Sequence, residues 1–335
     1  MKKAKVAVVG LGTIGQNIHL PVLTRLNDAE VVAVCDLDKT KARVVAEKFG
    51  VSRWYVDYSA MLAEEEEVVG VDICTPTKSH RDMAVAALQA GKNVLVEKPL
   101  ARSQTEANDI VETAKRKHLD LMVGMNNRFR PDAMILRSFI EDHALGKIFY
   151  AKAGWFRKLD SQSAWFAMKE QSGGGVVLDL GIVMFDLAFW MMGYPEVKEV
   201  TATNYRHSTK DVEDSSIVFM KMKNGSTLTI EASWSFESNS DFFYCDVFGT
   251  EGSGSLNPFR IVKRMHDSLV NVAPVVQESS QALFMKSYEN ELKHWVGSLR
   301  GVHPVLSTGE EAVYRMRIVD AIYKSAKMGK AVAIR

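Results

Sequence analysis

The chain has 335 residues, enough for two domains, since single domains usually contain about 100–200 residues. Lys and Arg (42) nearly balance Asp and Glu (41), and 47% of the residues are hydrophobic. This ordinary globular composition indicates neither a nucleic-acid partner nor a membrane partner. Cys35, Cys74 and Cys245 show no paired spacing, which favours a reduced, cytoplasmic protein, and we expect no signal peptide and no membrane span.

A glycine-rich turn follows the first predicted strand. Residues 5–9 form a β-branched run typical of a buried strand, and the next residues read Gly10-Leu11-Gly12-Thr13-Ile14-Gly15 before a helical stretch. A G-x-G-x-x-G between a strand and a helix is typical of dinucleotide binding. The first glycine permits the tight turn, the second lets the backbone approach a pyrophosphate, and the third allows close packing of helix and strand. The alternative is an ordinary glycine turn of a βαβ unit.

The second predicted strand, residues 31–35, ends at Asp36. This residue lies about 20 residues after the glycines, the spacing expected of an acid that binds the ribose 2′-hydroxyl. A carboxylate there repels a 2′-phosphate, so we expect NAD as the cofactor. Lys39 and Lys41 lie close in the sequence and leave NADP possible.

Strands and helices alternate along the rest of the first half. The predicted helices are 39–49, 59–68, 81–90 and 103–117, and the predicted strands are 71–74, 93–96 and 121–124. Glu64 to Glu67 are expected to form a solvated face. Repeated βα units predict a doubly wound parallel sheet. His80 follows a strand end at the expected ligand edge, where we favour a positional or structural role over proton transfer.

The strand 93–96 ends at Glu97-Lys98-Pro99. A lysine at the end of a buried parallel strand lies where open α/β sheets bind ligands, so Lys98 is a candidate for the reacting group. The alternative is that Glu97 and Lys98 form a surface ion pair.

The pattern changes around Asn126, where a basic, irregular segment begins. A helix over 131–142 and a strand over 148–155 are predicted next. The following stretch mixes aromatic and basic side chains that suit stacking on a sugar ring or holding an acidic group: Trp155, Arg157, Lys158, Trp165, Phe166 and Lys169. The alternative for each residue is that it fills a seam between domains.

Three glycines, Gly173 to Gly175, precede an apolar helix predicted over 176–192. Asp179 lies in its first turn among apolar residues, and a buried carboxylate needs a partner. We favour a site role for Asp179 over a contact with the helix dipole, and a structural role for Asp186.

Strands dominate from residue 197 onward. The predicted strands are 197–205, 215–223, 226–235 and 242–248, with a hairpin at Asn224-Gly225, and the neighbours are expected to be antiparallel. Two helices, 284–299 and 309–328, close the chain. Too few helices follow to cover both faces of this sheet, so we expect one face to pair with another subunit.

The chain resembles the Gfo/Idh/MocA oxidoreductase family over nearly its whole length. The resemblance rests on Gly10 to Gly15, Thr75-Pro76 with His80, Glu97-Lys98-Pro99, Arg128-Phe129-Arg130-Pro131, and Gly173-Gly174-Gly175 with Asp179 and Gly181. It implies an N-terminal Rossmann domain and a C-terminal α+β domain with a large, open-faced, mostly antiparallel sheet that pairs subunits. It also implies a cis bond at Lys98–Pro99 and NAD(P)-dependent chemistry on a sugar, cyclitol or similar polyol.

The catalytic set that the resemblance implies is the motif lysine, the helix aspartate and a histidine four residues later. The first two correspond to Lys98 and Asp179, but the third position is Val183, which cannot carry a proton. One acid–base group is sufficient in principle for hydride chemistry. Lys98 is the candidate for this group, with Asp179 orienting it or the substrate hydroxyl. Val183 favours carbonyl reduction or a different proton donor within 155–169.

We predict an NAD(P)-binding domain over 1–125 and a substrate-binding and oligomerisation domain over 126–335. The predicted cofactor-binding residues are Gly10, Gly12, Thr13, Ile14, Gly15, Asp36, Thr75, Pro76, His80, Glu97, Lys98 and Asn126. The predicted substrate-binding residues are Lys98, Trp155, Arg157, Trp165 and Asp179. We expect no metal, and a homodimer or homotetramer.

The predicted activity is hydride transfer between nicotinamide and a sugar, cyclitol or related polyol or ketosugar. A non-catalytic NAD(P)-binding regulator or partner subunit is the alternative, and Val183 favours it. A third possibility is an enzyme that retains its cofactor and uses transient oxidation for elimination or glycoside hydrolysis.

Overall fold

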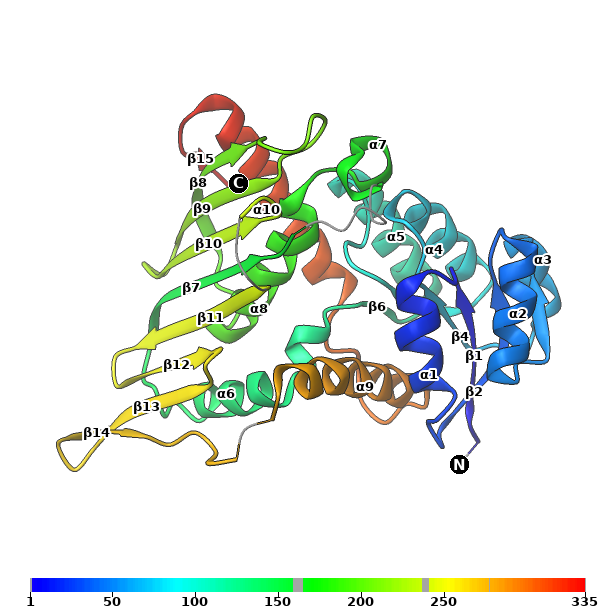
Figure 1. The fold of residues 1–335 in the computed structure, drawn as a ribbon, viewed down its shortest axis with the longest axis horizontal. Coiled ribbons are helices and arrows are strands. Elements are labelled where there is room, and N and C mark those ends of the chain that lie inside the picture. The colour runs from blue at the N-terminus through cyan, green and yellow to red at the C-terminus, as the bar shows by residue number, and fades with distance from the viewer. Residues whose placement is uncertain (1, 159–164, 237–240, 277, 335) are drawn as a thin grey trace. The chain divides into compact units, whose positions relative to one another are not determined.

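The computed structural model describes residues 2–158, 165–236, 241–276 and 278–334. It contains two compact units (Figure 1). Unit 1 comprises Met1–Asn126 and Met285–Tyr314, and unit 2 comprises Asn127–Phe284 and Arg315–Arg335. The division predicted from the sequence assigned every residue from 126 onward to the second domain, whereas residues 285–314 pack with the first unit.

Unit 1 is built on a six-stranded sheet in the order β3-β2-β1-β4-β5-β6. Every pairing in it is parallel, which confirms the doubly wound sheet predicted from the alternating pattern. The strands are β1 Ala4–Val9, β2 Ala29–Cys35, β3 Arg53–Tyr55, β4 Gly70–Ile73, β5 Asn93–Val96 and β6 Leu121–Val123. The three-residue strand β3 was not predicted, because it is too short to show a period.

The helices of unit 1 follow the expected order, with local signals at their ends. They are α1 Leu20–Leu23, α2 Lys39–Phe49, α3 Tyr58–Glu64, α4 His80–Gln89, α5 Gln104–Lys117 and most of α9, Ser280–Leu299. The Asp38 carboxylate accepts a hydrogen bond from the Lys41 backbone amide at the start of α2, which ends at Gly50 with φ +67°. A π-helical turn, Gly15–His19, precedes α1.

Helix α3 is shorter than predicted, and one of its acidic residues is not solvated. The helix ends at Glu64, where a run of like charges disfavours further turns. Glu65 is buried, with 2% of its surface exposed, and its carboxylate pairs with Arg53 (2.6 Å) and accepts a hydrogen bond from the Tyr55 hydroxyl (2.8 Å). The expectation of a solvated face was therefore wrong for this residue.

Residues 285–314 belong to unit 1 because their apolar side chains complete its core. Trp295 is fully buried, and its ring lies 2.9 Å from the position that a Cβ would take on Gly70 at the start of β4. Thr308 forms an isolated β-bridge with Met122 of β6. A side chain at position 70 would therefore collide with helix α9.

Unit 2 is built on a nine-stranded, mostly antiparallel sheet in the order β14-β13-β12-β11-β7-β10-β9-β8-β15. The strands are β7 Ile148–Phe156, β8 Val197–Tyr205, β9 Ser215–Met222, β10 Thr227–Ser233, β11 Phe242–Gly249, β12 Gly252–Leu256, β13 Arg260–Met265, β14 Ser268–Asn271 and β15 Val332–Ala333. The predicted hairpin at Asn224-Gly225 joins β9 to β10, and Gly225 has φ +87°.

One expected strand pairing was wrong. Strands β10 and β11 are consecutive in the chain but do not pair, because β7 lies between them, parallel to β10 and antiparallel to β11. Strand β7 comes from a distant part of the sequence, so no local pattern reveals this insertion. Strands β12 to β14 extend the sheet beyond the predicted strands.

Helices α8, Ile182–Met192, and α10, Gly309–Met328, lie on the same face of this sheet (Figure 1). Unit 2 also contains α6, Pro131–Glu141, and α7, Lys169–Ser172. The helical segment Lys169–Met192 is long and apolar enough to cross a membrane, but 89% of its most apolar 18-residue stretch is buried inside the structure. This burial is typical of a core helix.

Candidate active site

The glycine turn of unit 1 has the geometry that a dinucleotide requires. Gly10 has φ +88°, and a Cβ there would lie 2.7 Å from the Cys74 carbonyl carbon. A Cβ on Gly15 would lie 2.3 Å from the Gly10 carbonyl oxygen, whereas no heavy atom lies within 4 Å of a Cβ on Gly12. The first and third glycines are therefore needed for packing, and the second leaves its backbone open to a ligand. Thr13 and Ile14 complete the turn.

Asp36 lies beside this turn, as the spacing predicts. Its Oδ2 accepts a hydrogen bond from the Leu11 amide (2.8 Å), and its Oδ1 lies 3.4 Å from Lys41 Nζ. Lys41 is thus paired with the carboxylate, an arrangement that favours a ribose hydroxyl over a 2′-phosphate. Thr75, at the end of β4, has a buried hydroxyl with no hydrogen-bond partner among the described residues. These residues fit NAD.

Lys98 is the second residue after β5, at the carboxyl edge of the sheet. The Glu97 carboxylate accepts a hydrogen bond from the Lys98 backbone amide (3.1 Å), which holds the backbone that carries the lysine. The peptide bond between Lys98 and Pro99 is cis, as expected from the resemblance. Glu97 is buried rather than part of a surface ion pair, with 9% of its surface exposed.

His80 has a structural position. It is 1% exposed, and its two ring nitrogens each lie 2.8 Å from a backbone carbonyl oxygen, Nδ1 from Pro99 and Nε2 from Thr75. Burial lowers the pKa of His80, and the two carbonyl oxygens oppose that shift. The ring ties the end of β4 to the turn after β5, in agreement with the positional role that we favoured. Pro76 lies in the same connection.

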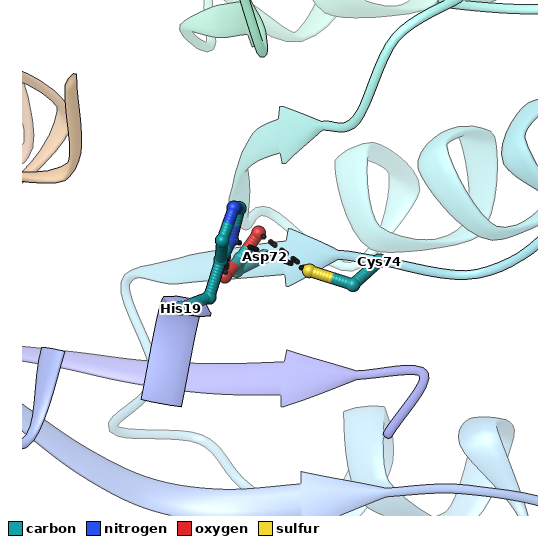
Figure 2. Close-up of side chains that lie close together, drawn as sticks. All are labelled: His19, Asp72 and Cys74. Atoms are coloured by element: carbon teal, nitrogen blue, oxygen red, sulfur yellow. Dashed lines mark hydrogen bonds and ion pairs between the residues drawn. The ribbon is translucent and has the colours of Figure 1, made fainter. Parts of the chain in front are cut away.

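Sequence reasoning missed a buried polar cluster next to these residues. His19, Asp72 and Cys74 point toward one another from the π-helical turn, from β4 and from the residue after β4 (Figure 2). The Asp72 carboxylate accepts a hydrogen bond from His19 Nδ1 (2.8 Å), and the Cys74 sulfur lies 3.3 Å from the same nitrogen. His19 Nε2 lies 3.2 Å from Glu97 Oε1. The sequence signal for this cluster would have been His19, a histidine within an otherwise apolar helical stretch.

In unit 2, Asp179 is the centre of a second cluster. Its Oδ2 accepts hydrogen bonds from Arg157 Nη2 (2.8 Å) and Trp234 Nε1 (3.0 Å). The Arg157 guanidinium lies 5.4 Å from the centroid of the Trp155 ring. Three predicted substrate residues therefore meet at one point. Trp234 was not predicted, although an inward-facing tryptophan on a strand needs a partner for its ring N–H.

The Asp179 segment is fixed by a second acid that the sequence did not reveal. Glu213 Oε1 accepts hydrogen bonds from the backbone amides of Gly175 and Val177 and from the Tyr323 hydroxyl, at 2.9–3.1 Å. A Cβ on Gly175 would lie 1.9 Å from the Glu213 carbonyl oxygen, which explains the third glycine of that motif. Asp179 itself lies on a π-helical turn, Val177–Gly181, rather than in the regular helix predicted.

The remaining predicted residues have more distant or structural positions. Trp165 stacks on Phe166 (3.9 Å between centroids), and residues 159–164 of the predicted aromatic and basic stretch lie outside the described residues. Asn126 donates a hydrogen bond to the Ser287 hydroxyl (2.9 Å). Asp186 accepts hydrogen bonds from Arg128 and Arg315 in a buried ion-pair network, in agreement with the structural role that we favoured. Val183 is 3% exposed.

A parallel sheet in this strand order, with an open glycine turn and an acid at the end of the second strand, defines a dinucleotide-binding domain. Family models confirm this class. The description "Oxidoreductase family, NAD-binding Rossmann fold" matches residues 4–125, and "Oxidoreductase family, C-terminal alpha/beta domain" matches residues 137–334. The chain belongs to the Gfo/Idh/MocA family and is an NAD-dependent dehydrogenase.

Individual relatives match along the full length. The chain is 28% identical to D-glucoside 3-dehydrogenase of Escherichia coli, over 98% of this chain and 97% of that protein. It is 27% identical to scyllo-inositol 2-dehydrogenase (NAD(+)) of Bacillus subtilis, over 99% and 96%. The crystal structure of GenD2 from gentamicin A biosynthesis in complex with NAD has a TM-score of 0.86 at 26% identity, covering 100% of this chain and 97% of that one.

Proposed function

We propose that the protein transfers a hydride between NAD and a sugar, cyclitol or related polyol or ketosugar, with Lys98 as the acid–base residue. The observation that carries this proposal is the position of Lys98 at the carboxyl edge of the sheet that holds the glycine turn and Asp36. The names of the relatives, a glucoside dehydrogenase and an inositol dehydrogenase, support the substrate class. The predicted cofactor-binding residues, Asn126 included, remain part of the proposal.

NAD, when bound, supplies the hydride acceptor for alcohol oxidation and, in its reduced form, the donor for carbonyl reduction. The chain must then move one proton, and Lys98 is positioned for this task. In oxidation its neutral amine would take the hydroxyl proton of the substrate. In reduction its ammonium would donate a proton to the carbonyl oxygen, and no histidine at position 183 would be required.

Asp179 is suited to orientation rather than to proton transfer. Its Oδ2 already accepts two hydrogen bonds, one of them from a guanidinium, and these partners favour the ionised form. The Asp179 side chain is 1% exposed, whereas the Arg157 side chain is 33% exposed. Arg157 therefore offers donors to a substrate hydroxyl while Asp179 holds it in place, and Trp155 offers an aromatic face for stacking on a sugar ring.

The alternative expected from the sequence, a non-catalytic NAD-binding regulator or partner subunit, disagrees with the assignment of the chain to a dehydrogenase family. The observation that favours it is Val183, which is buried and cannot replace a histidine in proton transfer. The retention of Lys98 and of a well-supported Asp179 favours the enzyme.

The decisive experiment follows the near-ultraviolet absorbance of reduced nicotinamide. The native protein and Lys98→Met would be incubated with NAD or NADP and a panel of sugars, cyclitols and ketosugars. We expect a substrate-dependent change with the native protein, about 100-fold or more slower in the variant, since general acid–base groups contribute about 10²–10⁴-fold. Lys98→Met with undiminished turnover would refute the role of Lys98. Tight NAD binding without turnover on any compound would favour the regulator.

We also propose a homo-oligomer formed through the outer face of the nine-stranded sheet. Apolar side chains are exposed along the strands of this face, among them Ile217 (49%), Phe219 (39%) and Phe242 (48%). Sedimentation of the native protein would test this, with Phe219→Lys expected to shift the population toward monomer. A native monomer at micromolar concentration would contradict it. The cytoplasmic location stays a prediction.

A further inference from the structure

The candidate for a further role is the buried cluster around His19 in unit 1. Its acid–base groups come from four segments: His19 from the π-helical turn, Asp72 and Cys74 from β4 and the residue after it, Glu97 from the end of β5, and Tyr288 with Glu291 from α9. His19, Asp72 and Glu291 are fully buried. The proposed hydride transfer uses none of these three side chains.

The distances indicate hydrogen bonding rather than a metal centre. His19, Asp72 and Cys74 offer a set of possible metal ligands (Figure 2). Tetrahedral bonds of zinc to nitrogen and oxygen keep the ligand atoms about 3.3 Å apart. His19 Nδ1 and Asp72 Oδ2 are only 2.8 Å apart, the distance of a direct hydrogen bond.

His19 Nδ1 is hydrogen-bonded to Asp72, whereas Nε2 lies 3.2 Å from Glu97 Oε1, within ion-pair distance but not aligned for a hydrogen bond. Ionised carboxylates only accept hydrogen bonds, so only the imidazolium is attracted on both sides. Burial alone lowers the pKa of His19, but the Asp72 carboxylate and Cys74 outweigh it and raise the pKa well above its usual value. This shift and the contact with the Asp72 carboxylate both favour the imidazolium form of His19.

The acids around His19 divide into charged and neutral members. Burial raises the pKa of Glu97, but His19 and Lys98 overcome this effect and lower it. Burial, followed by the Glu97 carboxylate, raises the pKa of Glu291 well above its usual value, against the opposing effects of His19 and the Met125 backbone. This shift favours the neutral form of Glu291, so that Asp72 and Glu97 are the carboxylates that pair with His19.

Glu97 connects this charge to the reacting lysine. One of its oxygens faces the His19 ring (3.2 Å), and the other accepts a hydrogen bond from the Lys98 backbone amide (3.1 Å). A Cβ on Gly124 would lie 3.3 Å from the oxygen that faces His19, so a larger residue at position 124 would crowd the carboxylate. The π-helical turn that presents His19 starts at Gly15, the last glycine of the cofactor turn. π-Helical turns of this kind are frequent at functional sites.

We propose that His19 is a positioning residue that, as an imidazolium, keeps Glu97 ionised and thereby holds the backbone of Lys98 in the reactive position. This inference rests on the proposed role of Lys98 in hydride transfer. Loss of the His19 charge removes one of the two cations that keep Glu97 ionised, so that Glu97 takes up a proton at a higher pH. A protonated Glu97 holds the Lys98 amide less firmly, because a charged acceptor binds more strongly than a neutral one.

The first test compares the pH profiles of kcat for the native protein and His19→Gln. We expect the acidic limb of His19→Gln to lie about one pH unit or more higher, as for a carboxylate that loses an adjacent cation. We expect kcat to fall about ten-fold while the NAD Kd and the substrate KM change about two-fold or less. His19→Gln combined with Glu97→Gln should lose the shifted limb, because the titrating carboxylate is gone.

Leu20→Ala is the matched control. Leu20 follows His19 in the chain, is fully buried and carries no charge. Its truncation should lower the melting temperature without moving the pH profile. If His19→Gln lowers the melting temperature and also leaves the profile unmoved, His19 is only structural and the proposal is refuted. If Lys98→Met retains turnover, the proposed function itself fails, which is a different outcome.

A second measurement does not depend on folding of the variants. In the native protein with ¹⁵N-labelled histidines, the His19 ring nitrogens should keep imidazolium shifts at least about one pH unit above the usual histidine pKa of about 6.5. The His19 ring would be assigned in the native protein from through-bond correlations between its ring and its own backbone atoms. A neutral His19 ring at pH 7 would overturn the proposal.

Discussion

The two π-helical turns, one in each unit, both carry a buried ionisable residue but surround it differently. In unit 1 the cation of His19 lies between the acids Asp72 and Glu97, and the side chains of His19 and Asp72 are fully buried. In unit 2 the anion of Asp179 lies between Arg157 and Trp234, and the Arg157 side chain is 33% exposed. The first cluster is closed and the second reaches solvent. The comparison indicates a supporting role for the first and a ligand-binding role for the second.

The largest expected effect is on the stability of the closed cluster. Asp72→Asn removes one carboxylate from a fully buried ion pair, which we expect to cost about 3–5 kcal/mol of the free energy of unfolding. Urea denaturation would measure it. Glu47→Gln, which breaks an exposed pair with Arg43, should cost less than about 0.5 kcal/mol. Equal losses in the two variants would remove the distinction between the clusters.

The ion pairs of His19 also predict in which direction the stability of the protein changes with pH. The pKa of His19 is raised in the folded state, so its ion pairs stabilise the protein fully below the usual histidine pKa. That contribution is lost as the pH rises through the folded-state pKa. Asp72→Asn should therefore lose less stability on going to alkaline pH than the native protein does.

The open cluster should respond in activity rather than in stability. Asp179→Asn keeps the shape but removes the charge that holds Arg157, and we expect kcat/KM to fall about 100-fold with NAD binding unchanged. In Trp234→Phe, which removes the ring N–H donor and part of the buried indole, kcat/KM should fall about ten-fold or less. Steady-state kinetics and NAD fluorescence titration would separate the two effects. Loss of NAD binding in Asp179→Asn would contradict the assignment to substrate.

The smallest effect is expected at Glu291. Its pKa is raised by burial, so the native protein loses stability as the pH rises above about 4.3, where the unfolded chain ionises. Glu291→Gln removes that penalty and should match or exceed the native stability at pH 7, by about 1 kcal/mol. The difference should vanish in acid. A large destabilisation at pH 7 would show that Glu291 is ionised in the folded protein.

Local sequence patterns predicted the cofactor-binding edge of unit 1 much better than the cluster around His19. The glycine turn, Asp36 and Lys98 each lie at the end of a short strand, and local spacing is sufficient to place them on one sheet edge. The partners of His19 could not be predicted in this way, because Asp72, Glu97 and Glu291 come from β4, β5 and α9. A helical period also does not reveal an inserted residue, so neither π-helical turn was predicted.

In unit 2, the position of Asp179 was predicted but its partners were only partly found. Arg157 was singled out as a base among aromatic residues, whereas Trp234, just after β10, was overlooked and Glu213, before β9, had no pattern that distinguished it. The insertion of β7 between β10 and β11 brings residue 157 to the Asp179 segment. Pairing between strands so distant in the sequence depends on the whole fold.

The return of residues 285–314 to unit 1 has a consequence for how the chain is assembled. The polypeptide crosses between the units after residues 126, 284 and 314, so no single cut separates two complete folding units. A fragment that stops at residue 125 would lack Trp295 and Glu291 and would expose the apolar surface at Gly70. During synthesis, the core of unit 1 therefore cannot be completed until residues 285–314 have left the ribosome.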